Sequence, residues 1–515
     1  MLGSSIVVTL LSFIISLISF INQLVIANIF GATILMDAYI VAVSIPLLVS
    51  AVIVGFVNYS LVPFLIKYKE DANQYGNVST LILMALVFIS LLLIVVGFLT
   101  TPLFMTTFGK TFPAEVRDEA IAIYRISWIT VSFMLVGGHL AAIHNASKRF
   151  ALPVIASAFP YIMMIVFCLN YGQAWGPISI TLGMLVGFIG SVILLSKRAL
   201  MDMKLTKEYS RLWKDVATFF TQAPLVIPAM LCFTAYQTID AYWAPRIGSG
   251  NLAHLGYCQR LLVAMGNLVI VGPSVVLVPH LAEAFNEGRH EDFLRDIGRA
   301  VRMVVSLAAP LAISVSILST PLVELLFQRG AFDIHATQGV AALLPFMMLG
   351  MVAMLSVVLL FRALFAKGSI LSSSVLGIAA TTIYFVLSGL FSTYWGAMGI
   401  AAAYAITWWI ILILAIYVIW RGRAELIYSK ENVTFIVHLI ISLVVVSIVV
   451  FCGKILTIDV VQNAGYLEKM FRVSLVSVTA MIVFYIMAVK LFRIEDINYI
   501  FEFLFRKVVN AWKRI

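Results

Sequence analysis

The sequence predicts an all-α polytopic membrane protein, and three observations support this fold class. Of its 515 residues, 62% are hydrophobic and only 11% are charged, whereas soluble domains have about 25% charged residues. The mean hydropathy is +1.06. The apolar residues also gather in long runs separated by short polar segments. Together these features exclude a soluble enzyme, a disordered chain and a nucleic-acid-binding protein.

Fourteen apolar runs are long enough to cross a bilayer as helices, which takes about 20 residues each. Several runs exceed this length, so we expect tilted helices or helices that protrude from the membrane. The runs lie at 5–30, 38–66, 79–108, 118–146, 150–171, 175–196, 215–245, 253–284, 297–329, 336–366, 369–391, 396–420, 433–455 and 469–491.

The distribution of basic residues predicts that both termini are cytoplasmic. With the N-terminus inside, cytoplasmic segments contain 25 of the 34 Lys and Arg residues. This asymmetry follows the positive-inside rule, and it explains the net charge of +10 without a nucleic-acid partner. Eight basic residues fall in outer segments or their flanks, namely Lys110, Arg117, Arg125, Arg246, Arg329, Lys454, Lys469 and Arg472.

An internal repeat predicts two pseudo-symmetric halves. Residues 31–70 contain GATILMDAYI and then SLVPFLIKYKE, and residues 248–288 contain GSGNLAHLGY and then VLVPHLAEAFNEG. The spacing from glycine to proline is 32 residues in the first copy and 31 in the second. The copies start six predicted spans apart, so they have the same orientation in the membrane. Parallel repeats of this kind are typical of transporters whose substrate site lies between the halves.

The domain organisation follows from this repeat. We expect a six-helix N-lobe, a basic cytoplasmic linker, a six-helix C-lobe and an appended helix pair. The last residues read as an amphipathic helix on the anionic inner membrane surface, with a regulatory tail as the alternative. In this order the segments are 1–196, 197–214, 215–420, 421–491 and 492–515.

Ionisable residues at bilayer depth are costly and are therefore candidates for function. Arg260 lies one or two turns inside span 8, where an arginine must pair, snorkel or face water. It is either a phosphate-binding group, since phosphate oxygens match the guanidinium fork, or an anchor that snorkels outward. Asp240 in span 7 could neutralise Arg260, coordinate a coupling cation, or simply lie at the membrane interface. Asp37 is most simply a helix-capping or first-turn acid.

Other motifs exclude several mechanisms. His139 and His144 in span 4 are expected to pack rather than to bind a ligand. The chain has no HExxH motif, nucleophile elbow or P-loop, and its four cysteines show no CxxC spacing. We therefore predict no metal site and no ATP-driven transport by this chain alone.

Three stretches resemble the MurJ/MviN family of bacterial flippases, within the multidrug/oligosaccharidyl-lipid/polysaccharide exporter superfamily. IANIFGATILMDAYIVAVSIPLL with LVPFLIKYK resembles its span 2 region. YCQRLLVAMGNLVIVGPSVVLVPHLAEAFNEGRHEDF resembles span 8 and the following loop, and ILSTPLVELLFQRGAFD resembles the exit of span 9. The resemblance implies a V-shaped central cavity between two six-helix lobes and a lipid-accessible groove at spans 13–14. It also implies that alternating access moves a polyprenyl-diphosphate-linked saccharide across the bacterial inner membrane.

The resemblance also implies roles for individual residues. Arg260 matches a cavity arginine of the family that would meet the diphosphate. Asp37 matches the acid of its span 2 motif and is a second candidate for binding the substrate. The family carries arginines in spans 1 and 2, but this chain has no Lys or Arg between Met1 and Ile66. Ser16 and Asn22 stand at the span 1 positions, and Ser50 or Ala51 stands at the span 2 position.

Two interpretations of this departure remain open. The chain could export another lipid-linked saccharide, such as an exopolysaccharide or O-antigen unit, in place of lipid II. Alternatively, neutral hydrogen bonds replace the missing cations in contacting the headgroup. The candidate donors and acceptors are Ser16, Asn22, Asn58, Tyr59 and Ser60.

Two rival functions were weighed against the flippase. A cation-coupled multidrug exporter would need acidic residues facing its cavity, and Asp240 supplies at most one while Arg260 would repel cationic drugs. A glycan ligase or acyltransferase would need a large outer loop or a cluster of His, Asp and Glu.

We expect a non-enzymatic, monomeric transporter with no cofactor, coupled to a monovalent cation or the membrane potential. Its expected partners are an undecaprenyl-diphosphate-linked glycan, membrane lipids and envelope-glycan synthesis enzymes.

Overall fold

The computed structural model describes residues 2–491, except 69–70, 202, 204–208, 222, 288, 422–424, 426–429 and 460–464. Every regular element in these residues is a helix. Eleven helices are long and apolar enough to cross a membrane, and the bent pair Leu212–Thr221 with Val226–Thr234 would make a twelfth. The all-α, multi-pass fold class is therefore confirmed. The count of fourteen spans stays a prediction, and the amphipathic tail 492–515 lies outside the described residues.

The chain forms two compact units. Unit 1 comprises Met1–Gly256 and Arg329–Ala336, and unit 2 comprises Tyr257–Gln328 and Thr337–Ile515. The predicted lobes follow the sequence repeat rather than these packing units, and they stay a prediction.

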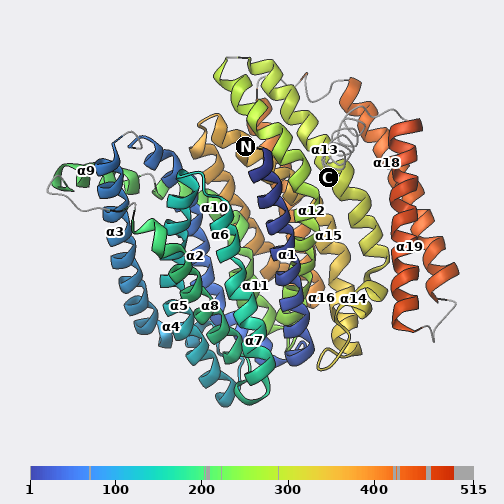
Figure 1. Ribbon diagram of the computed structural model, residues 1–515. Coiled ribbons are helices and arrows are strands. Elements are labelled where there is room, and N and C mark those ends of the chain that lie inside the picture. The colour runs from blue at the N-terminus through green and yellow to red at the C-terminus, as the bar shows by residue number, and fades with distance from the viewer. Residues whose placement is uncertain are drawn as a thin grey trace. The chain divides into compact units, whose positions relative to one another are not determined.

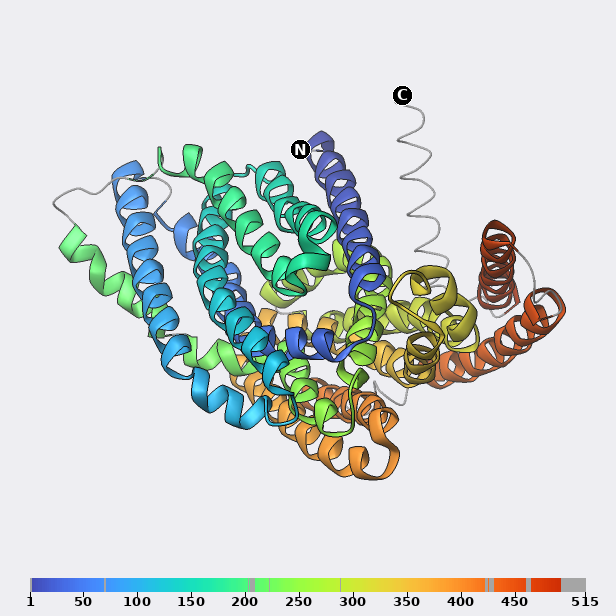
Figure 2. The ribbon, with the colours of Figure 1, turned by 90° about the horizontal axis from the view of Figure 1, so that it is seen from below.

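Unit 1 is built around α5, which packs against α2, α3 and α8, while α7 packs against α8 and α1 (Figures 1 and 2). Two buried histidines hold α5 in place. The His139 Nε2 atom lies 3.0 Å from the Ser79 carbonyl oxygen, and the His144 Nε2 atom lies 3.0 Å from that of Leu195. The helices are α1 (Leu2–Phe30), α2 (Ile34–Ile66), α3 (Ala72–Leu99), α4 (Thr101–Phe108), α5 (Ala114–Ala146), α6 (Ala151–Ala156), α7 (Ala158–Trp175), α8 (Ile178–Ala199), α9 (Tyr209–Thr221), α10 (Ala223–Thr234), α11 (Tyr236–Trp243) and a 3₁₀ turn (Ala244–Arg246).

A polar and aromatic contact joins α9 to the end of α2 that the charge pattern places in the cytoplasm. The Tyr68 hydroxyl donates to Asp215 Oδ2 at 3.0 Å. The ring of Phe219 packs on those of Phe56 and Phe64, with centroids 5.0 and 5.2 Å apart. Burial, together with the Asp215 carboxylate, raises the pKa of Tyr68 to about 12. The hydroxyl therefore remains a protonated donor at physiological pH.

The two copies of the repeat form equivalent long helices. The helix α2 begins at Ile34, three residues after Gly31, and has 33 residues. The helix α12 (Asn251–Asn286) begins three residues after Gly248 and has 36 residues. The first turn of α12 belongs to unit 1, and the helix continues into unit 2.

In the described residues, unit 2 contains the rest of α12 and eight further helical elements. Those following α12 are α13 (His290–Ile317), α14 (Ser319–Phe327), α15 (Ile334–Ala366), whose first residues belong to unit 1, α16 (Ile370–Trp420), α18 (Lys430–Gly453), a π-helical turn (Lys454–Asp459), α19 (Tyr466–Tyr485) and a second π-helical turn (Ile486–Leu491).

The 51-residue α16 is a helical hairpin rather than one helix. Gly396 breaks it with a φ of 58° and a ψ of −137°, a conformation that glycine adopts without strain. The Tyr384 and Tyr404 ring centroids lie 6.2 Å apart, whereas twenty residues of continuous helix would separate them by about 30 Å. The chain therefore reverses at Gly396, between the predicted spans 369–391 and 396–420.

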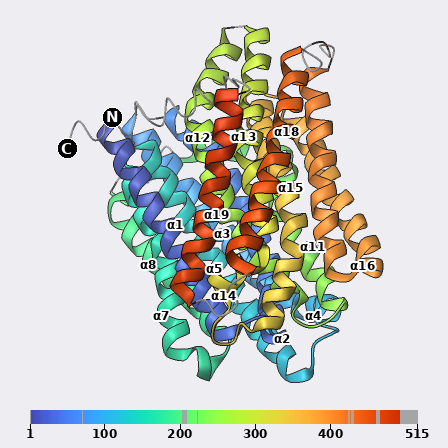
Figure 3. The same ribbon diagram turned by 90° about the vertical axis from the view of Figure 1, so that its right-hand side faces the viewer.

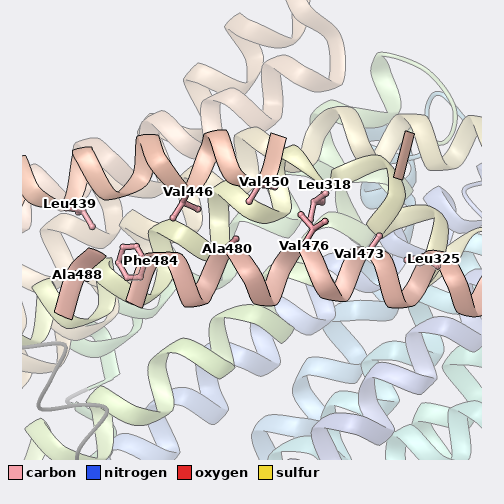
Figure 4. Close-up of a cluster of buried hydrophobic side chains, with 10 residues drawn as sticks. All are labelled: Leu318, Leu325, Leu439, Val446, Val450, Val473, Val476, Ala480, Phe484 and Ala488. Atoms are coloured by element: carbon pink, nitrogen blue, oxygen red, sulfur yellow. The ribbon is translucent and has the colours of Figure 1, made fainter. Parts of the chain in front are cut away.

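The appended pair α18 and α19 packs against α13 and α14 through an apolar cluster (Figures 3 and 4). Val446 and Val450 of α18 face Val473, Val476 and Ala480 of α19 in this cluster. Both helices also carry apolar residues that are exposed in the protein alone, such as Ile440 and Leu475. This pattern is typical of helices that are packed on one face and meet lipid on the other.

Candidate functional site

A buried carboxylate occupies the N-terminus of α12. Asp37, in the first turn of α2, is only 1% exposed. Its carboxylate oxygens accept hydrogen bonds from the backbone N–H groups of Gly250 at 2.5 Å and Ala253 at 2.7 Å. A helix start leaves four N–H groups without intrahelical partners and carries a positive partial charge, so an aspartate stabilises it. Asp37 is therefore a first-turn acid of α2, one of the two roles that the sequence suggested, and its side chain caps a second helix, α12.

Two glycines allow the segment 329–336 to lie against the end of α1. The Ala331 N–H donates to the Asn28 carbonyl oxygen at 2.8 Å. Gly31 and Gly330 both have a φ of 58°. A Cβ atom on Gly31 would overlap the Ala331 carbonyl, and one on Gly330 would overlap the Asn28 carbonyl. This contact lies at the C-terminal end of α1, and Asp37 lies at the adjacent N-terminal end of α2. The charge pattern predicts that both helix ends are on the outer side of the membrane.

Arg260 is half-buried on α12 and lies against an aromatic ring of its own helix. Its guanidinium carbon is 5.3 Å from the centroid of Tyr257, which lies one turn earlier. Tyr257 is buried and also packs on Phe327, with centroids 5.4 Å apart. A cation over a desolvated ring gains roughly 0.5–2 kcal/mol. The contact therefore holds the guanidinium group against its own helix, beside the buried Tyr257 ring.

Asp240 is buried in α11, where it is 1% exposed. Nearby, the Thr238 hydroxyl donates to the Ser44 carbonyl oxygen at 3.2 Å, which ties α11 to α2. Asp240 belongs to unit 1 and Arg260 to unit 2. The pairing of these two residues therefore stays a prediction.

The predicted neutral headgroup contacts of the N-lobe lie in different environments. Ser16 is exposed, and its hydroxyl donates to the Ser12 carbonyl oxygen of the same helix at 3.0 Å. Asn22 is fully buried, with its Nδ2 atom 3.9 Å from the Met164 sulfur of α7. Ser60 is buried, and the side chains of Asn58 and Tyr59 lie outside the described residues. Ser16 and Asn22 therefore do not share one exposed surface.

An apolar pocket of about 490 Å³ lies between α19 and the helices α12, α13 and α14 of unit 2. Leu311 and Val315 of α13 and Leu322 of α14 form one wall, and Val473 and Met481 of α19 line the opposite side. This is the region where the family resemblance placed a lipid-accessible groove. Among the described residues, no group of three or more His, Cys, Asp or Glu could hold a metal ion.

One ion pair next to this pocket was not anticipated from the sequence. Lys469 of α19 and Glu324 of α14 pair at 2.6 Å. Glu324 lies near the predicted outer end of span 9, and Lys469 is one of the eight basic residues of the predicted outer segments and flanks. Because 145 residues separate them, no local spacing could have joined the two.

A family model described as "Lipid II flippase MurJ" matches residues 26–476 of the chain. The chain belongs to the MurJ family. Among MurJ relatives, the probable lipid II flippase MurJ of Buchnera aphidicola subsp. Acyrthosiphon pisum is 24% identical over 479 residues, covering 90% of this chain and 92% of the relative. The lipid II flippase MurJ of Burkholderia cenocepacia is 25% identical over 373 residues, covering 68% and 70%.

Solved structures share the MurJ fold with this chain. A lipid II flippase MurJ in an inward closed conformation matches with a TM-score of 0.73 and 17% identity, covering 93% of this chain and 99% of that one. An inward-facing MATE family multidrug resistance transporter of the MOP superfamily matches with a TM-score of 0.67 and 12% identity, covering 82% and 99%. Identities this low indicate a common fold and leave the transported substrate undefined.

Proposed function

We propose that this protein is a flippase that moves a polyprenyl-diphosphate-linked saccharide across the bacterial inner membrane by alternating access. The observation that carries the proposal is the match to the MurJ family over residues 26–476. Relatives of this chain are named lipid II flippases. Lipid II is therefore the first substrate to test, followed by related precursors of envelope polysaccharides.

Arg260 is the residue that would bind the diphosphate. An arginine presents a planar fork of donors that matches phosphate oxygens, and it keeps its charge at any physiological pH. The Tyr257 ring at 5.3 Å limits the freedom of the guanidinium before substrate arrives. Less entropy is then lost on binding than with a free arginine side chain.

The saccharide headgroup and the lipid tail would travel by different routes. The tail would stay in lipid along α18 and α19, where the pocket of about 490 Å³ is lined by apolar side chains. The headgroup would pass Arg260 between the two predicted lobes. A tail route lined with apolar groups avoids the cost of exposing hydrocarbon to water.

The absence of Lys and Arg between Met1 and Ile66 bears on which saccharide is carried. Fewer cations in the N-lobe mean weaker attraction for a highly charged headgroup. The exposed Ser16 could contribute a neutral contact, whereas the buried Asn22 could do so only after α1 moves away from α7. Another lipid-linked envelope saccharide therefore remains the alternative to lipid II.

Further features complete the proposal. Both termini would be cytoplasmic, as the 25 cytoplasmic basic residues favour. The membrane potential or a monovalent cation would return the carrier to its inward state, and Asp240 is the candidate for cation coupling. We propose a monomer that works beside envelope-glycan synthesis enzymes without being an enzyme itself.

The test is complementation of a bacterial strain depleted of its own lipid II flippase. We expect the wild-type chain to restore growth, Arg260→Ala to abolish it, and Arg260→Lys to retain part of it. Arg125→Ala is a matched control, because Arg125 also lies over an aromatic ring, that of Phe98, at 5.5 Å. Full activity of Arg260→Ala at normal expression would remove Arg260 from the mechanism.

A failure to complement the strain depleted of its lipid II flippase would point to a different substrate. If the wild-type chain is expressed but fails to complement, transport of other polyprenyl-diphosphate-linked saccharides in vesicles becomes the deciding assay. If the chain instead conferred resistance to cationic drugs, that result would favour the multidrug exporter. The likeness to the MATE transporter supports a common fold and does not by itself favour drug export.

A further inference from the structure

A single ridge of α19 runs from the apolar pocket to a lysine. Val473, Ser477, Met481 and Tyr485 line the pocket at intervals of four residues. Lys469 continues this series by one turn, and residues four apart lie on the same face of a helix. Lys469 therefore stands at one end of the pocket, which the charge pattern predicts to be the outer end.

An acid of unit 2 holds this lysine. The Lys469 Nζ atom lies 2.6 Å from Glu324 Oε1, in the last turn of α14, and the two side chains are 29% and 35% exposed. Leu322, two residues before Glu324, also lines the pocket. The ion pair therefore lies one helical turn beyond Val473, which lines the pocket, and both of its side chains are partly accessible.

The neighbouring charged residues Glu468 and Arg472 stabilise the connection between α18 and α19. Arg472 pairs with Glu468 at 2.5 Å, and its Nη1 atom donates to the Thr457 carbonyl oxygen at 2.6 Å. This arrangement joins the π-helical turn after α18 to the start of α19. Lys469 instead pairs with Glu324 of α14, so the connection between α18 and α19 does not require it.

A basic residue on the outer side runs against the positive-inside trend. Lys454, Lys469 and Arg472 are three of only eight basic residues in the predicted outer segments and flanks. A lipid whose tail lies in the pocket would place its phosphate at the membrane interface, next to Lys469. A diphosphate carries more charge and more acceptor oxygens than one carboxylate, so it can displace Glu324 from the ammonium group.

We propose that Lys469 is a phosphate-binding residue for a polyprenyl-diphosphate lipid whose tail lies in the adjacent pocket, and that Glu324 is its counter-ion until the lipid arrives. This inference rests on the proposed function and adds a second phosphate contact to Arg260. Glu324 competes with the phosphate, so the two residues act in opposite directions on lipid affinity. An ion pair with a purely structural role would make both act in the same direction.

The test measures binding of farnesyl diphosphate to the purified full-length protein in detergent by native mass spectrometry. We expect Lys469→Gln to weaken binding about tenfold, as loss of one charge-assisted hydrogen bond implies. Lys469→Arg retains binding, and Glu324→Gln tightens it severalfold. Glu468→Gln is the matched control, because it removes an acid from the neighbouring pair, and it leaves the affinity unchanged.

Two further ligands and one background variant separate the possible sources of signal. Farnesol tests the tail without phosphate, and inorganic diphosphate tests phosphate without the tail; we expect neither to respond to the Lys469 and Glu324 substitutions as farnesyl diphosphate does. The farnesyl diphosphate measurements are repeated in a protein that also carries Arg260→Ala. We expect the Lys469 and Glu324 substitutions to change the affinity there by the same factors. Equal weakening by Lys469→Gln and Glu324→Gln, or inorganic diphosphate binding as tightly as farnesyl diphosphate, would overturn the inference. Successful complementation beside either result would leave the proposed function standing.

Discussion

Replacing Asp37 by alanine tests whether one carboxylate holds the start of α12. The change removes the acceptor of two N–H groups, those of Gly250 at 2.5 Å and Ala253 at 2.7 Å. A hydrogen bond to a charged group contributes about 1.5–3 kcal/mol. Asp37 is 1% exposed, so water cannot readily replace the lost acceptor. We therefore expect the first turn of α12 to lose about 3 kcal/mol of local stability or more.

Amide hydrogen exchange measured by mass spectrometry reports this loss directly. For a peptide covering residues 248–256, about 3 kcal/mol corresponds to roughly 150-fold faster exchange through local opening. Asp37→Asn keeps one acceptor oxygen, so about half of the effect remains. The rest of unit 1 should exchange as in the wild type unless the whole unit unfolds.

Asp71→Ala is the matched control for this experiment. Asp71 also accepts hydrogen bonds from two backbone N–H groups, those of Asn73 and Gln74, at the start of α3. It is exposed, so its loss costs about 1 kcal/mol and affects α3 alone. Unchanged exchange at 248–256 in Asp37→Ala would refute the capping role and return Asp37 to the substrate-contacting role that the family resemblance implies.

Four further predictions concern single substitutions. Gly31→Ala should lower stability by about 2 kcal/mol or more in heated size-exclusion chromatography, since its φ of 58° and the opposing carbonyl leave no room for a Cβ. Gly298→Ala should instead raise stability by about 0.5–1 kcal/mol, because no atom lies within 4 Å of the added Cβ. Equal effects of the Gly31 and Gly298 substitutions would contradict the packing described. Gly396→Ala should destabilise the α16 hairpin by about 1–3 kcal/mol, because a φ of 58° and a ψ of −137° suit glycine and strain alanine. An unchanged melting profile would argue against the chain reversal at Gly396. Tyr68→Phe should cost about 1 kcal/mol or less by removing the bond to Asp215. Because the pKa of Tyr68 is raised to about 12, that bond is present below about pH 10 and is lost only as the pH rises through 12. The Tyr68→Phe cost should therefore be constant from about pH 6 to 9, and a cost that changes across this range would contradict the neutral donor.

Hydropathy was sufficient to predict the fold class, because the length of an apolar run is a local property of the chain. The break between the predicted spans 369–391 and 396–420 is an example, since Gly396 lies at the reversal. The contact between Arg260 and Tyr257, three residues earlier, is likewise local, because residues three apart share a helix face. The family was likewise recognisable from short stretches around Asp37 and Arg260.

Contacts between distant segments could not be predicted in this way. The bond from Gly250 to Asp37 joins residues 213 apart, and the pair Lys469–Glu324 joins residues 145 apart. The sequence marks Asp37 and Glu324 as costly acids near helix ends, but it does not say which helix or cation each one meets. The burial of Asn22 against α7 was also hidden, because a neutral polar residue in an apolar helix fits either a packed or a wet face.

The long helix α12 contributes residues to both compact units. Its first turn is clamped in unit 1 by Asp37, and from Tyr257 onward it belongs to unit 2. The chain passes between the units only here and at the two edges of segment Arg329–Ala336. Arg260 lies one turn beyond the first of these crossings, on the same helix whose start Asp37 caps, so a single continuous helix connects the buried acid to the candidate phosphate-binding residue.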